Sequence, residues 1–93
     1  MTRHAFRLGT TTAFTLSGSS QASAAFGAET FQVRVATSDQ PAFISIGDGT
    51  PTATASDAIM PPGWVDYFAV TPGQRIAVLQ AGTAGKITVT EIA

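Results

Sequence analysis

The chain has 93 residues and no cysteine, so it holds one domain at most, and neither a disulfide nor a cysteine-based metal site can stabilise it. Hydrophobic residues make up 44% of the chain and charged residues only 12%, about half of the roughly 25% that soluble domains carry. The five basic residues are scattered and the formal net charge is −1, so we expect no nucleic-acid partner. Small size and low charge favour a compact core and association into a homo-oligomer.

The N-terminus has the outline of a secretory signal, with basic residues before a partly apolar stretch and small residues at 22–24. The stretch at 8–16 carries four threonines and is too polar for the apolar region of a signal, so we expect no secretion. No segment approaches the roughly 20 apolar residues of a transmembrane helix, and we expect no membrane partner. We predict an N-terminal arm at 1–10 and a single β domain at 11–93.

Apolar and polar residues alternate with a period of two along most of the chain, which indicates β-strands, and no helical periodicity is present. Clusters of Gly, Pro, Ser and Asp separate the alternating runs and mark turns. Six or seven short strands at this spacing predict an all-β fold, a small antiparallel β-sandwich or barrel. In chain order we predict strands at 11–16, 29–36, 42–46, 64–70, 75–80 and 86–92, and we leave the short segments at 22–26 and 58–60 open.

The alternation also predicts which side chains face the core. In the strand at 29–36, Phe31, Val33 and Val35 share one face and should be buried. In the next strand, Phe43 points away from the apolar face, which makes it a candidate contact residue.

The strand at 64–70 is apolar on both faces. Trp64 and Phe68 share one face, and Tyr67 lies on the other. One side of this strand must therefore look away from the core, and we take Trp64 and Tyr67 as candidate contact residues. Core packing, a protein interface and a sugar-binding platform are all compatible with such aromatic residues.

Residues for catalysis are scarce. The only histidine is His4, in the predicted arm, and no serine lies in a Gly-x-Ser-x-Gly elbow. Asp66 lies inside a predicted strand, where it could be buried beside Arg34 or Arg75, or face a partner. The remaining aspartates lie in predicted turns, where this residue type bends the backbone: Asp39, Asp48 and Asp57. We expect no enzyme.

Loop carboxylates and carbonyls suit calcium, so the loop at 47–57 with its two aspartates is a conceivable site. Its spacing does not match the EF-hand loop, and no Gly-rich phosphate loop precedes a helix. We expect no cofactor and no metal.

Several motifs occur in an order that resembles a family of small proteins encoded by tailed phages and prophages. The most distinctive are PTATASD at 51–57, VTPGQ at 70–74 and IAV at 76–78. Supporting motifs include Val-Arg-Val at 33–35 and Pro-Pro-Gly at 61–63, and the resemblance extends over most of the chain from about Leu8 onward. It implies a virion-associated structural protein.

The composition agrees with a capsid decoration or cement protein that binds the lattice of the major capsid protein. We expect a homo-oligomer on the capsid surface of the virion, produced in the host cytoplasm. A head-to-tail connector, a tail or fibre-base β-domain, and a carbohydrate-binding surface module stay open as alternatives. The candidate partner-contact residues are Arg3, His4, Phe6 and Arg7 in the arm, and Phe43, Trp64 and Tyr67 in the β domain.

Overall fold

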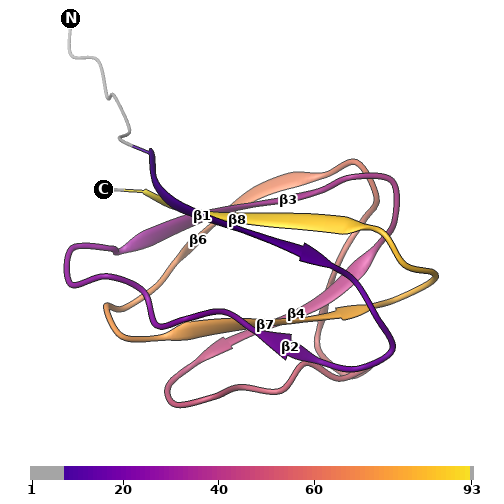
Figure 1. Cartoon of the computed structure of the whole chain (residues 1–93), viewed down its shortest axis with the longest axis horizontal. Coiled ribbons are helices and arrows are strands. Elements are labelled where there is room, and N and C mark those ends of the chain that lie inside the picture. The colour runs from indigo at the N-terminus through magenta and orange to yellow at the C-terminus, as the bar shows by residue number, and fades with distance from the viewer. Residues whose placement is uncertain (1–7, 93) are drawn as a thin grey trace, which may run out of the picture.

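A computed structural model describes residues 8–92, which contain eight strands and no helix (Figure 1). The two segments left open by the sequence form short strands, so the number of strands exceeds the six or seven predicted. The strands are β1 (Leu8–Thr15), β2 (Gln21–Ala22), β3 (Gln32–Thr37), β4 (Ala42–Gly47), β5 (Ala58–Met60), β6 (Val65–Ala69), β7 (Arg75–Gln80) and β8 (Lys86–Ile92).

The strands form two four-stranded antiparallel sheets, which pack face to face as a sandwich (Figure 1). The predicted all-β sandwich is thereby confirmed. Sheet A has the order β1-β8-β3-β6 and sheet B the order β2-β7-β4-β5. Pairing runs from the chain ends inward, because β1 pairs with β8, β2 with β7, β3 with β6, and β4 with β5. This arrangement, a long antiparallel ribbon rolled into two sheets, is that of an eight-stranded jelly roll.

The core lies between the sheets and is built from alternate residues of the central strands. Val33 and Val35 of β3 are fully buried, and they lie opposite inward-facing residues of β8. Ile76 and Val78 of β7 close the core from sheet B. Burying one such side chain stabilises the fold by about 1.5–3 kcal/mol, so β3, β7 and β8 contribute strongly to its stability.

Two predictions about the early strands are wrong. β1 begins at Leu8 instead of at residue 11, because Leu8 pairs with Ile92 across an irregularity in the register. Phe31 is 64% exposed instead of buried, because β3 begins after it. Thr30 is buried instead, and its hydroxyl donates a hydrogen bond to the Glu91 side chain.

A loop at 48–57 crosses the outer side of sheet B. Ala53 in this loop is 3% exposed, and its N–H donates to Ser20 Oγ, beside β2, at 2.9 Å. Ala77 of β7 is fully buried although the alternation directs it outward, so this part of the outer side of sheet B is covered. The outer side of sheet A has no such cover from residues 8–92.

Candidate interaction surface

The surface of interest is the outer face of sheet A, the side of β1, β8, β3 and β6 that points away from the core. Residues directly opposite each other in neighbouring strands point to the same side, so the register assembles this face row by row. The three rows are Leu8–Ile92–Gln32–Ala69, Thr11–Thr90–Arg34–Tyr67 and Ala13–Thr88–Ala36–Val65.

Apolar and hydroxyl side chains dominate this face. Leu8, Val65 and Tyr67 are each 45% or more exposed, and they lie on its two flanking strands. In its middle, Thr90 is buried by its neighbours, and its hydroxyl lies 3.0 Å from the hydroxyl of Thr11. The exposed apolar groups of this face are typical of a protein-binding surface.

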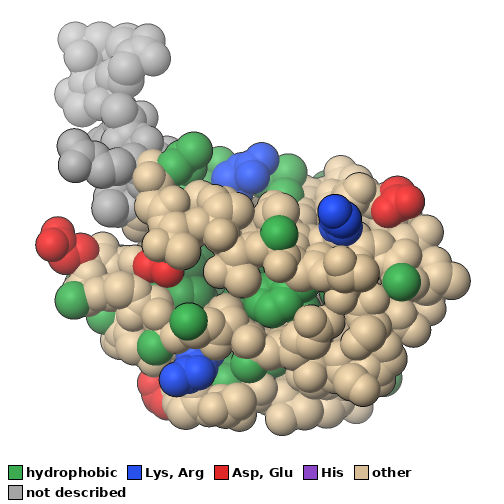
Figure 2. Space-filling model, viewed as in Figure 1, with side chains coloured by type: hydrophobic (Ala, Val, Ile, Leu, Met, Phe, Trp, Pro, Cys, Tyr) green, Lys and Arg blue, Asp and Glu red, His purple; other side chains and the backbone are tan. Residues whose placement is uncertain are grey.

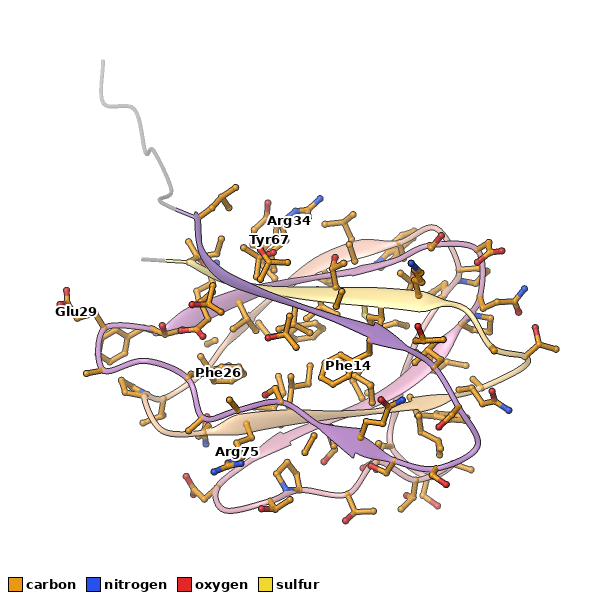
Figure 3. The ribbon with its side chains drawn as sticks, in the orientation of Figure 1. Phe14, Phe26, Glu29, Arg34, Tyr67 and Arg75 are labelled. Atoms are coloured by element: carbon orange, nitrogen blue, oxygen red, sulfur yellow. The ribbon has the colours of Figure 1, made fainter. Side chains whose placement is uncertain are left out.

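The charges on this face have one sign. Arg34 and Lys86 point outward from it, whereas the two acidic residues of its strands, Asp66 and Glu91, have the opposite strand parity. Arg34 lies directly opposite Tyr67 on the neighbouring strand, and the two are labelled side by side in Figure 3. The face therefore has a weakly basic character around an apolar and hydroxyl-rich centre.

β1 and β6 form the two edges of sheet A, and the edge at β6 carries Asp66. Thr37 N–H donates to Trp64 O and Val70 N–H to Phe31 O, so even-numbered residues of this segment bond to β3. The N–H of Tyr67 consequently points to the free edge, where Asp66 Oδ1 accepts it at 2.8 Å. The Asp66 carboxylate occupies a backbone N–H that an added strand would need for pairing, so it protects this edge from pairing with another chain.

The interpretation of Asp66 as a buried partner of an arginine is wrong. Its side chain is exposed and bonds to the backbone of its own strand, because β6 lies at the sheet edge instead of in the interior. The other prediction for Asp66, contact with a partner chain, stays a prediction.

The candidate contact residues of the β domain do not form one surface. Tyr67 lies on the outer face of sheet A, whereas Phe43 lies on the outer side of sheet B between Ile59 and Leu79. Trp64 precedes β6 and is 51% exposed, with its backbone tied to the Thr37 hydroxyl. The four candidates in the arm, Arg3, His4, Phe6 and Arg7, lie outside the described residues.

Two exposed apolar residues of this face are absent from the candidates that the sequence suggests. Val65 has the same strand parity as Tyr67, so the alternation could have placed both on one face. Leu8 could not have been found, because the predicted arm includes it and its pairing partner, Ile92, is at the other end of the chain.

Residues 8–92 contain no group of three or more acidic or histidine side chains that could hold a metal ion. Within the same range there is no helix of the length and apolarity needed to cross a membrane. Comparisons of the chain with protein-family models, with curated proteins and with solved structures gave no match.

Proposed function

We propose that this chain is a structural protein of a phage particle, a capsid decoration or cement protein that docks on the major capsid protein. The observation that carries the proposal is the outer face of sheet A, on which Leu8, Val65 and Tyr67 are exposed and few side chains are charged. The opposite side of the sandwich is partly covered by its own loop at 48–57. The sequence resemblance to small phage proteins supports the same function.

The fold adds support by analogy alone. Jelly rolls recur in viral capsid domains, and they also occur in lectins and cupins, so the fold does not choose between these functions. A lectin function would need an aromatic platform beside polar groups. Trp64 and Tyr67 leave the β6 segment on opposite sides, so they do not form one platform.

The size of the face favours a homo-oligomer. Four strands of five to eight residues, spaced about 4.8 Å apart, give a projected area of roughly 400 Å². A standard protein interface contributes about 800 Å² of accessible surface per partner, so one copy would dock weakly. Linked copies that bind a repeating lattice gain affinity through effective concentration without any new contact.

The decisive experiment is the copy number and location of the chain in purified virions, measured by quantitative mass spectrometry and electron cryo-microscopy. Decoration predicts hundreds of copies over the capsid lattice. A count of about six to twelve would contradict decoration and favour a connector or tail ring of closed symmetry. Absence of the chain from the virion would overturn the proposal altogether.

The docking face is tested by substituting Val65 with Asp and measuring binding to capsids that lack this protein. We expect at least a tenfold loss of affinity, because a carboxylate would be desolvated in an apolar contact. Ile59→Asp is the matched control, since Ile59 is 55% exposed on sheet B. Equal binding by both variants would show that another surface docks, provided that their thermal stabilities agree.

A further inference from the structure

The sandwich carries a cavity of about 280 Å³ where the two sheets part along β1. It is lined by Thr10 and Thr12 of β1, the segment at 23–27, and Val89 and Glu91 of β8. Figure 2 looks onto this side of the molecule and shows apolar side chains inside a hollow between the sheets. Small-molecule sites measure about 300–1,000 Å³, so this cavity suits one side chain or a similarly small group.

Among residues 8–92, Glu91 is the one charged residue of the lining, and two hydrogen bonds fix its side chain. Its Oε1 accepts hydrogen bonds from the Gly27 N–H at 3.0 Å and from the Thr30 hydroxyl at 2.5 Å. Its Oε2 accepts none from any residue between 8 and 92. Since a carboxylate offers about four acceptor positions, Glu91 keeps unused acceptor capacity beside the cavity.

The other described residues of the lining are apolar or carry hydroxyl groups. Phe26 and Val89 form buried apolar walls, and Figure 3 shows Phe26 between the two sheets. Thr10 and Thr12 add hydroxyls that can accept hydrogen bonds. The cavity thus combines apolar walls with a fixed, negatively charged rim.

We propose that this cavity binds a basic side chain of a partner protein, with arginine as the best fit. A long basic side chain buries its apolar stem and keeps its charged head beside polar groups, which matches the walls and the rim. The guanidinium carries five donors in a rigid plane, and Glu91 together with the threonine hydroxyls supplies acceptors for several of them. This site is independent of the proposed docking through sheet A.

Other small ligands fit less well. An anion would meet Glu91, and the part of the lining formed by residues 8–92 contains no basic side chain. A sugar would stack on an aromatic face, but Phe26 is only 5% exposed and offers no such platform.

The test is titration of the isotope-labelled full-length protein with N-acetylarginine methylamide, followed by two-dimensional NMR. The matched ligand control is the citrulline analogue, which has the same shape and no charge. We expect localised shifts at Thr10, Gly27 and Val89 with a Kd of about 1–10 mM, and at least tenfold weaker binding of the citrulline analogue.

Glu91→Gln is the variant to compare, because glutamine keeps an acceptor for Gly27 and Thr30 but loses the charge. We expect it to bind at least tenfold more weakly, whereas Glu29→Gln, at an exposed turn labelled in Figure 3, binds as the unaltered protein does. Equal affinity for both ligands, or no localised shift, would overturn the proposal. Because the two ligands are compared on the unaltered protein, the proposal stays falsifiable even if Glu91→Gln fails to fold.

Sedimentation velocity then identifies the source of the basic side chain. A second copy of this chain predicts self-association that added N-acetylarginine methylamide reverses and that Glu91→Gln lacks. A monomeric unaltered protein whose cavity still binds the ligand assigns the side chain to a different protein.

Discussion

Ile87 shows how single residues hold this molecule together. It lies on β8 in the middle of sheet A, is fully buried, and faces Phe14 and Thr37 on the two neighbouring strands. We expect Ile87→Ala to lower the free energy of unfolding by about 2–5 kcal/mol, because the removed methyl groups leave a cavity that the sheets cannot close. Urea denaturation followed by circular dichroism measures the change.

The control for this substitution is Val65→Ala, which removes similar groups from an exposed position of the same sheet. We expect it to change the free energy of unfolding by no more than about 0.5 kcal/mol. Similar losses for the two variants would mean that Ile87 is not part of a tightly packed core.

Single residues also show where prediction from the sequence succeeds. Val33 and Val35 could be assigned to the core because they alternate with polar residues inside a strand. Phe31 could not be placed, since hydrophobicity favours burial whereas its position before the start of β3 exposes it. The environment of Asp66 could not be predicted either, because its role depends on β6 being an edge strand, and no local pattern encodes strand order.

Among the secondary structure elements, the edge strand β6 offers the clearest prediction. Asp66 occupies the outward N–H of Tyr67, and we expect Asp66→Ala to free this group for pairing with another strand. The Asp66→Ala protein should therefore associate more strongly than the unaltered protein at the same concentration, as measured by sedimentation velocity. Asp66→Asn is the matched control, because its amide oxygen can still accept the bond.

An Asp66→Ala protein that associates no more strongly than the Asp66→Asn protein would contradict the capping role. The same result would mean that β6 resists edge pairing because it is short, with five residues, and not because of Asp66.

The elements differ in how far the sequence predicts them. β7 and β8 have the predicted bounds, because turn residues border two runs of clear alternation. β2 has only two residues, and it is fixed by pairing with β7 and by the bond from Ser23 N–H to Ile76 O. Such a strand exists because of its neighbours, so its own residues carry no signal for it.

At the scale of the whole molecule, the sequence predicts a sandwich or barrel but not the jelly-roll order. Strand order follows from pairings between distant segments, and β1 with β8 is the extreme case, since Phe14 lies opposite Ile87. The candidate surface inherits the same difficulty. Its rows combine residues from both ends of the chain, so only the contribution of β6 could be found from local alternation.

This topology has a kinetic consequence. Each sheet needs contacts between segments far apart in sequence, and the entropy of closing these long loops must be lost before the core forms. We expect refolding on a time scale of milliseconds to seconds, as for other β-sandwiches. Stopped-flow fluorescence can follow it through Trp64, the only tryptophan, whose backbone pairs with Thr37 at the end of β3.

The refolding experiment also tests how the two sheets depend on each other. If the sandwich forms in one cooperative step, the logarithms of the folding and unfolding rates vary linearly with urea and give one V-shaped plot. Val89→Ala on β8 should then speed unfolding or slow folding without adding a second phase. Refolding within microseconds would contradict the expected cost of closing these long loops. A tryptophan signal that changes before the circular dichroism does would mean that β3 and β6 pair before β1 and β8 do.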